Sequence, residues 1–352
     1  SFPASELRAI MLEAAERIAV YQPDAMGHGR AREAVAAWYA RRGAPADPAR
    51  ILLTPGTSQA YFYALRLLAD AGDEILVPSP GYPLFDDLAA IAGVRLRRYH
   101  LRRERGQWSI DPDEVDFQCT PRTRALMVVS PHNPTGLMPG AGDWEALAAI
   151  CRRRGLALVV DEVFCETLAR GGRYERPAVE AFPLVLTLNG LSKMLSLPGW
   201  KVGWMKVDGA PECVAPLLEA LDHLNDTFLP LPDLQQAMIP ALLDAGERGW
   251  FAHLAEIISR RREAALRCLE ASGFVADACP AGVYLCVQLD EAPDRGSAAP
   301  DEGFALRALL EAGVLVHPGS YYSLPSHWVM TCITGEDRLE DGIRRLAGMR
   351  PG

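Results

Sequence analysis

The chain has 352 residues, 49% of them hydrophobic, which is enough for a large α/β unit or for two domains. Its formal net charge is −9 at pH 7 and no basic stripe stands out, so nucleic acid is excluded as an expected partner. We find no secretory signal peptide and no apolar run long enough to span a membrane, and we expect a cytoplasmic protein with no membrane partner.

Eight cysteines occur, none of them with the CxxC spacing of redox or zinc motifs. Several lie inside apolar segments, so we expect reduced thiols, mostly buried, and no metal site. Position 1 is serine rather than methionine, and we expect residues to precede it in the natural chain.

The chain opens with a predicted helix over residues 4–20, in which Leu7, Ile10 and Ile18 recur at the helical period. The loop that follows is rich in glycine and proline, which break helices. A second helix is expected over 32–42.

From residue 50 onward, short apolar segments alternate with segments of helical period. This alternation is typical of an α/β fold with a mainly parallel sheet, here of seven strands, covered by helices on both faces. The predicted strands are 50–56, 74–80, 94–101, 125–136 with its polar loop, 156–163, 184–191 and 202–207. The predicted helices between them are 56–70, 80–93 and 144–153.

Beyond about residue 211 the pattern changes to long helical segments followed by a few strands. This change predicts a smaller α+β unit. Its predicted helices are 212–224, 233–245, 247–272, 302–312 and one at the C-terminal end, and its strands are 274–290 (as a strand or hairpin), 314–318 and 328–334. Residues 293–300 are predicted to form a surface loop.

Lys193, Lys201 and Lys206 are the only lysines among 36 basic residues. Arginine keeps its proton near neutral pH and cannot act as an amine nucleophile, whereas lysine can form a Schiff base. Lys193 follows the apolar segment 184–188 and so lies at a strand end, where open α/β sheets build their sites. The alternative is that all three are ordinary surface lysines.

Further loops after predicted strands carry polar or aromatic groups. Thr57, Ser58 and Gln59 open a helix, where free N–H groups favour an anion, although a simple helix cap explains them equally well. Tyr82 offers a ring that can stack on a planar heterocycle or fill the core. Asn133 offers an amide in a proline-containing turn, and alone it indicates only that turn.

Asp161 ends an apolar strand, where a carboxylate needs a cationic or hydrogen-bonding partner. A helix cap or a buried ion pair would meet that need as well. Considered jointly with the other loops, however, the set matches pyridoxal phosphate. The phosphate would lie at the helix start, the ring on Tyr82, the ring oxygen near Asn133, the pyridine nitrogen at Asp161 and the aldehyde on Lys193.

With these motifs in this order, nearly the whole sequence resembles the class I/II aminotransferases, which are fold-type-I pyridoxal-phosphate enzymes. The segment LSKMLSLPGWKVGW is similar to the lysine motif of a bacterial alanine-aminotransferase-like branch. The resemblance implies that Lys193 forms the internal aldimine and then shuttles a proton. With Lys193 it implies cofactor contacts for nine further residues, namely Tyr21, Thr57, Ser58, Gln59, Tyr82, Asn133, Asp161, Phe164 and Lys201, with Lys201 at the place of a usual arginine.

The resemblance also implies a domain organisation and an assembly. A large cofactor-binding domain would cover residues 21–221, and residues 1–20 and 222–352 would form a small domain from both chain ends. The protein would be a homodimer with shared active sites, in which Tyr21 reaches the phosphate of the partner subunit.

Three features depart from the family pattern. Phe164 replaces a tyrosine that hydrogen-bonds the cofactor's ring oxygen, and Gly190 replaces a serine that binds the phosphate. The segment 328–334 has no arginine, although most of the family clamps the substrate carboxylate with one there. We expect the carboxylate to be held by other groups, either residues before Ser1 or backbone donors.

We therefore expect an aminotransferase that moves an amino group from a small or apolar L-amino acid to a 2-oxo acid. Tyr322, Trp328 and Met330 are expected to line an apolar substrate pocket. One alternative is a β-lyase, which would use the same Schiff base but expel a β-substituent. Another is a non-catalytic cofactor-binding regulator joined to a DNA-binding domain, which the negative net charge disfavours.

Overall fold

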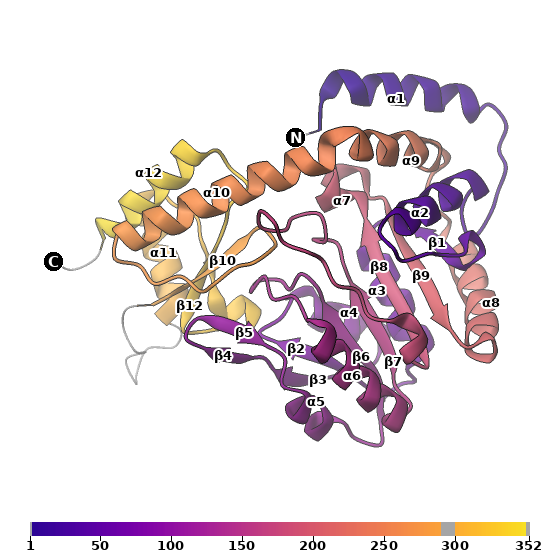
Figure 1. The fold of residues 1–352 in the computed structure, drawn as a ribbon, viewed down its shortest axis with the longest axis horizontal. Coiled ribbons are helices and arrows are strands. Elements are labelled where there is room, and N and C mark those ends of the chain that lie inside the picture. The colour runs from indigo at the N-terminus through magenta and orange to yellow at the C-terminus, as the bar shows by residue number, and fades with distance from the viewer. Residues whose placement is uncertain (1, 290–299, 350–352) are drawn as a thin grey trace.

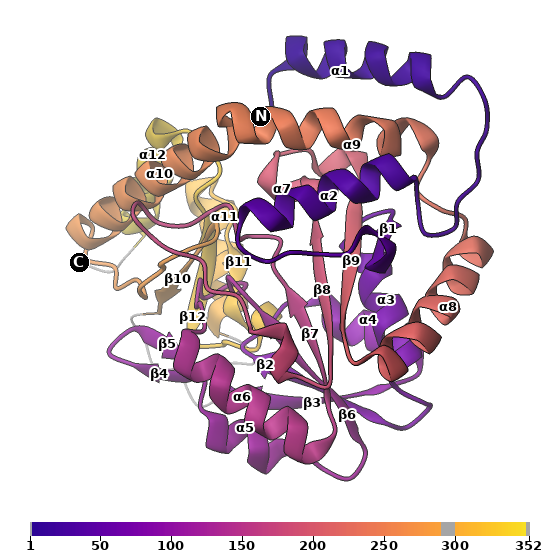
Figure 2. The ribbon, with the colours of Figure 1, turned by 45° about the vertical axis from the view of Figure 1, so that its right-hand side comes forward.

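Two β-sheets organise the protein, and Figures 1 and 2 show them side by side. The structure, a computed structural model, describes residues 2–289 and 300–349. Most of the predicted loop at 293–300 therefore lies outside the described residues, and Pro300 begins a helix. No helix within the described ranges is both long and apolar enough to cross a membrane.

The larger sheet has seven strands in the order β1-β9-β8-β7-β6-β2-β3. Its strands are β1 (Ile51–Thr54), β2 (Glu74–Ser79), β3 (Arg95–His100), β6 (Thr123–Val129), β7 (Ala157–Asp161), β8 (Leu184–Gly190) and β9 (Gly203–Gly209). Strand β9 runs antiparallel to both of its neighbours, whereas the pairs from β8 to β3 are all parallel. The predicted α/β class and mainly parallel seven-stranded sheet are confirmed.

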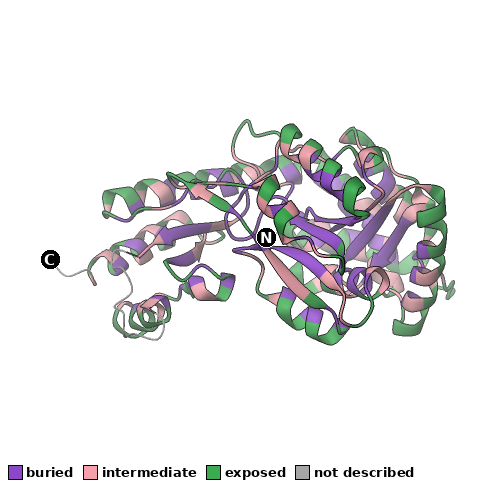
Figure 3. Cartoon of the chain, turned by 90° about the horizontal axis from the view of Figure 1, so that it is seen from below, coloured by how far each residue is buried: buried purple, intermediate pink, exposed green. Residues whose placement is uncertain are grey.

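Helices cover both faces of this sheet, because alternate strand residues point to opposite sides. In β8, Leu186 and Leu188 pack with α3 (Thr57–Leu68), α4 (Leu84–Ala92) and α8 (Pro211–Phe228). Val185 of the same strand packs on the other side with α6 (Ala141–Arg154). Figure 3 shows the result, with buried strands between helices that expose only their outer faces.

Three further helices lie near the edge of the larger sheet that is formed by β1. They are α1 (Ala4–Arg17), α2 (Gly29–Arg41) and α9 (Asp233–Ala245). Helices α1 and α2 both pack against α9, although α1 lies at the outside of the molecule (Figure 1). Two short helices, α5 (Pro112–Gln118) and α7 (Leu191–Met194), complete the elements around the sheet.

The smaller sheet contains β10 (Tyr284–Gln288), β12 (His327–Thr331) and β11 (His317–Pro318) in that order, all antiparallel. It packs with α10 (Phe251–Ala271), α11 (Pro300–Ala312) and α12 (Glu336–Ala347) around a core of its own. A hairpin of β4 (Arg102–Glu104) and β5 (Gln107–Ser109) contacts this unit. The contact centres on Asp277, which is 2% exposed and accepts hydrogen bonds from Arg103 and Trp108.

Several predicted boundaries were wrong. Of the described part of the segment 274–290, which ends at residue 289, only Tyr284–Gln288 forms a strand. The strand predicted at 328–334 ends at Thr331, and the first helix ends at Arg17 rather than at residue 20. The β4–β5 hairpin was not predicted, because its strands have three residues each and are mostly exposed. All eight cysteines are free, and six are buried. The predicted domain boundaries remain a prediction.

Candidate active site

A cavity of about 110 Å³ lies where β6, β7 and β8 end, at the edge of the sheet where α/β proteins bind ligands. Six of the ten residues predicted to bind the cofactor line it, namely Thr57, Tyr82, Asn133, Asp161, Phe164 and Lys193. Six others that sequence reasoning had not assigned to the site complete the lining, namely Tyr61, Val129, Val163, Gly190, Ser192 and Tyr284.

Asp161 is a buried carboxylate with no cation in direct contact among the described residues. Its Oδ2 accepts a hydrogen bond from the Tyr61 hydroxyl at 2.5 Å, and its Oδ1 accepts one from the Val163 N–H at 2.9 Å. Loss of hydration raises the pKa of Asp161 to about 6, against the effect of these two donors, which lower it. A protonated ring nitrogen would supply the charge that this carboxylate lacks.

Lys193 projects from α7 into the cavity, so that its side chain is exposed there. Its Nζ lies 5.7 Å from the centre of the Phe164 ring. The pKa of Lys193 is lowered, chiefly because the surrounding protein displaces water and also because of the charge of Lys201, whereas Asp161 opposes the shift. A lowered pKa increases the fraction of neutral amine, which is the form that attacks an aldehyde.

Asn133 is buried beside this cavity, and its side-chain amide is not fully hydrogen-bonded. Its Oδ1 has no partner among the described residues. A buried amide atom left unpaired costs about 1–3 kcal/mol, so a polar ligand group here would be stabilising. The preceding His132 is hydrogen-bonded through Nδ1 to Thr135 at 2.9 Å, and burial lowers its pKa to about 3, so the imidazole is neutral.

Two glycines allow close backbone contacts here, Gly203 with the start of α3 and Gly190 with the neighbouring β9 side. A Cβ on Gly203 would lie 2.9 Å from the Thr57 backbone nitrogen, and one on Gly190 would lie 2.5 Å from the Val202 carbonyl oxygen. Gly190 therefore has no room for a side chain, which gives the departure from serine a packing cause. Gly56 precedes α3 without a side-chain cap, so the first N–H groups remain available to an anion.

Four predicted cofactor residues do not line the cavity. Ser58 and Lys201 are exposed, and Tyr21 is 73% exposed. The Gln59 amide is hydrogen-bonded to Tyr63 and, at 3.4 Å, to Asn225. Lys201 adopts a left-handed backbone conformation with φ of 53°. Their roles stay predictions.

The expected substrate pocket is partly corrected. Trp328 is 1% exposed and packs its ring on Phe274 and Phe304 in the core of the smaller unit, so it does not line the cavity. Met330 and Tyr322 do not line it either. Tyr284 provides the wall on this side, with its ring 6.1 Å from that of Phe164.

The residues present fit pyridoxal phosphate. Asp161 would hold the pyridine nitrogen, Lys193 the aldehyde, Asn133 the ring hydroxyl and the start of α3 the phosphate. The fit depends on groups that lack protein partners here, namely a buried carboxylate without a cation, a buried amide atom without a hydrogen bond and an uncapped helix start.

Comparison with known proteins gives matches along almost the whole chain. The family model "Aminotransferase class I and II" matches residues 4–346. Aspartate/prephenate aminotransferase of Thermus thermophilus is 33% identical over 331 residues, which are 93% of this chain and 82% of that protein. An S-alkyl-thiohydroximate lyase of Arabidopsis thaliana is 29% identical, over 90% of this chain and 70% of the lyase. A solved aspartate aminotransferase of Thermus thermophilus, a double mutant, matches with a TM-score of 0.87 at 29% identity, covering 99% of this chain and 88% of the other.

The burial of Asp161 leads to a prediction about stability. Its pKa is higher in the folded chain, about 6, than the ordinary value of 3.8. The folded state thus binds the proton more tightly, and the free energy of unfolding falls as pH rises from about 4 to about 6. Asp161→Asn removes this penalty, which amounts to about 2–3 kcal/mol. Urea unfolding of the cofactor-free protein should show the variant more stable than wild type by about that amount at pH 8, with little difference at pH 4.

The matched control is Asp226→Asn, at an exposed aspartate. It should leave the difference between pH 4 and pH 8 unchanged. Equal stability of Asp161→Asn and wild type at pH 8 would show that burial does not penalise the Asp161 carboxylate.

Proposed function

The chain belongs to the class I and II aminotransferases, which are pyridoxal-phosphate enzymes, and we propose that it transfers the amino group of a small or apolar L-amino acid to a 2-oxo acid. The observation that carries the proposal is the meeting of one lysine amine and one buried carboxylate at the same cavity, Lys193 and Asp161. A lysine and an acid at one ring-sized site suit the exchange of an amino group through a pyridine cofactor.

Each residue then has a task. When bound, pyridoxal phosphate supplies a ring that withdraws electrons from the substrate α-carbon. Asp161 would keep the proton on the ring nitrogen, because its buried carboxylate is stabilised by an adjacent positive charge. The Lys193 Nζ would bind the aldehyde and afterwards move a proton from the substrate α-carbon.

The other cofactor contacts are proposed from the walls of the cavity. Tyr82 and Phe164 would flank the ring, Asn133 would form a hydrogen bond with its hydroxyl group, and Thr57 would bind the phosphate. Ser58 and Gln59 follow Thr57 in the first turn of α3, and Lys201 follows the turn after α7, and we propose that they contribute to the phosphate cup once the phosphate is bound.

Lys193→Ala should abolish transamination, while Lys201→Ala should retain it with weaker cofactor binding. The reason is that Lys193 is the only lysine lining the cavity among the described residues. Borohydride reduction of the holoenzyme followed by peptide mass spectrometry should find the cofactor attached to Lys193. Attachment to Lys201 or Lys206 would refute the assignment.

The proposed substrate range follows from the charges in the cavity. Lys193 is the one cationic residue in its described lining, and its amine is the reacting group. A second carboxylate on the substrate would lose hydration without a partner, so alanine and methionine should exceed aspartate in kcat/KM by at least about tenfold. Single-turnover absorbance of the holoenzyme with each amino acid measures this. Aspartate as the best donor would contradict the proposed range.

A β-lyase is the second candidate, favoured by the similarity to the S-alkyl-thiohydroximate lyase. The same holoenzyme should be incubated with a cystathionine-type thioether while ammonia, pyruvate and thiol are followed. Release of all three without a 2-oxo acid acceptor would identify a lyase. A requirement for the acceptor supports the aminotransferase.

We also propose a homodimer in which Tyr21 reaches the partner's phosphate site. Tyr21 is 73% exposed, although tyrosine usually buries most of its ring, so an intersubunit contact would explain its position. Light scattering should give a mass of two chains, and Tyr21→Phe should weaken cofactor binding. A monomer with full activity would exclude this arrangement.

A further inference from the structure

A tyrosine of α3 contacts the Asp161 carboxylate at the wall of the candidate active site. Tyr61 lines that cavity, although the whole residue is only 1% exposed. Its hydroxyl donates to the Asp161 Oδ2 at 2.5 Å, which is shorter than the 2.9 Å hydrogen bond from the Val163 N–H to Oδ1. Each carboxylate oxygen has a second lone pair, so Asp161 can accept both bonds and still bind a further donor in the cavity.

The packing around Tyr61 fixes the place of its hydroxyl. The ring meets Phe85 of α4 edge to face, with the two ring centres 5.4 Å apart. Both rings belong to a core that also contains Val129 and Leu188 of the large sheet. A close-packed ring keeps one position, so the Tyr61 oxygen stays at the carboxylate and does not swing toward solvent.

Tyr61 is a hydrogen-bond donor and not a base in the neutral pH range. Burial, together with the charge of Asp161, raises the pKa of Tyr61 well above its ordinary value. The hydroxyl therefore keeps its proton, and its hydrogen bond favours the ionised form of Asp161 over the protonated form.

Tyr61 is also the strongest of the groups that favour the ionised form of Asp161. Burial raises the pKa of Asp161, and Tyr61 opposes this effect more than the Val163 N–H or the charge of Lys193 does. Tyr82 lines the same cavity but is uncharged near neutral pH, because burial raises its pKa above the ordinary value for tyrosine.

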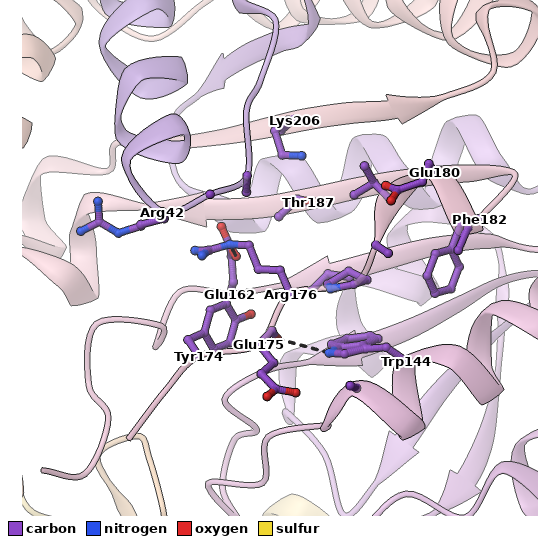
Figure 4. Close-up of a pocket in the computed structure, with 18 of the residues that line it drawn as sticks. Arg42, Trp144, Glu162, Tyr174, Glu175, Arg176, Glu180, Phe182, Thr187 and Lys206 are labelled. Carbon is purple, nitrogen blue, oxygen red and sulfur yellow. Dashed lines mark hydrogen bonds and ion pairs between the residues drawn. The ribbon is translucent and has the colours of Figure 1, made fainter. Parts of the chain in front are cut away.

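The other acid near Asp161 acts in the opposite direction. Burial raises the pKa of Asp161, and the negative charge of Glu162 adds to that rise. The Glu162 carboxylate lines a separate cavity, where the Arg176 Nε donates to it at 2.8 Å (Figure 4). Asp161 has no such ion pair among the described residues, so the Tyr61 hydroxyl is its main protein partner.

A carboxylate and a pyridine nitrogen that face each other compete for one proton. In the protein without cofactor the pKa of Asp161 is about 6, which is close to that of a pyridine nitrogen. Loss of the Tyr61 donor would make the carboxylate the stronger base, and the proton would move from the ring nitrogen to Asp161. A ring without that proton withdraws electrons less strongly.

We propose that Tyr61 is a positioning residue that keeps this proton on the ring nitrogen of the cofactor by holding Asp161 in its ionised form. Because the role needs pyridoxal phosphate with its ring nitrogen at Asp161, it rests on the proposed function. Helix α3 would then act on the cofactor twice, through its first turn at the phosphate and through Tyr61 at the ring nitrogen.

The test compares Tyr61→Phe with Tyr63→Phe in the holoenzyme. Tyr63 lies two residues further along α3 and is 0% exposed, but its hydroxyl donates to the Asn225 Oδ1 at 3.0 Å and not to Asp161. Each variant loses one buried hydroxyl, while phenylalanine keeps the packed ring. The cofactor carries an isotopically labelled ring nitrogen, whose NMR chemical shift distinguishes a protonated from a neutral ring.

Wild type and Tyr63→Phe should show a protonated nitrogen at neutral pH, whereas the signal of Tyr61→Phe should move toward the value of a neutral ring. An unchanged signal in Tyr61→Phe, or a neutral ring nitrogen in wild type, would overturn the proposal and leave the proposed function intact. A chain that binds no pyridoxal phosphate would contradict the proposed function and this role together.

Urea unfolding of the cofactor-free protein gives an independent measurement. Asp161 binds its proton more tightly in the folded chain, so the free energy of unfolding falls as pH rises from about 4 to about 6. In Tyr61→Phe the fall should continue to a pH about one unit higher, since a hydrogen bond to a charged group has been removed. Tyr63→Phe should keep the pH interval of wild type. The same interval in Tyr61→Phe would show that its hydroxyl does not control the charge of Asp161.

Discussion

The candidate active site depends on one electrostatic constraint, the burial of the Asp161 carboxylate without a cation beside it. A carboxylate in that position is costly because it loses its hydration, and hydrogen bonds from Tyr61 and from the Val163 N–H offset only part of the cost. Such a residue is stabilised when a positively charged group enters the cavity. The uncompensated Asp161 carboxylate is therefore part of what favours a positively charged pyridine ring at this site.

At the end of β7, two consecutive acidic residues, Asp161 and Glu162, point into two different cavities. Asp161 lies at the cavity with Lys193, while Glu162 lines a separate cavity of about 590 Å³ and is held by Arg176 and Asn189. The negative charge of Glu162 still raises the pKa of Asp161, because the two residues are adjacent in the chain.

The strands and the position of Lys193 could be predicted because they follow from local patterns, namely apolar runs, helix breaks and a rare residue type. Tyr61, Ser192 and Tyr284 could not be assigned to the site in this way. Tyr61 lies in a helix among apolar residues, and only the register of α3 against β7 places its hydroxyl at Asp161. Trp328 was misplaced for the converse reason, since an aromatic residue on a strand can face the core as readily as a pocket.

Strand β12 contains no arginine that could clamp a substrate carboxylate, and the arginines near it do not take that role. The nearby guanidinium groups serve other partners: Arg103 is bound to Asp277, and Arg262 donates to the backbone oxygens of Thr167 and Gly282. Through those two contacts Arg262 connects the segment after Phe164 to the segment before Tyr284, which are two walls of the cavity. Arg262 therefore holds these two walls together, and the rings of Phe164 and Tyr284 beside them are aromatic cavity surface. The proposed substrate range rests on this lining of tyrosine and phenylalanine rings, which favours a fit by shape and polarity over paired charges.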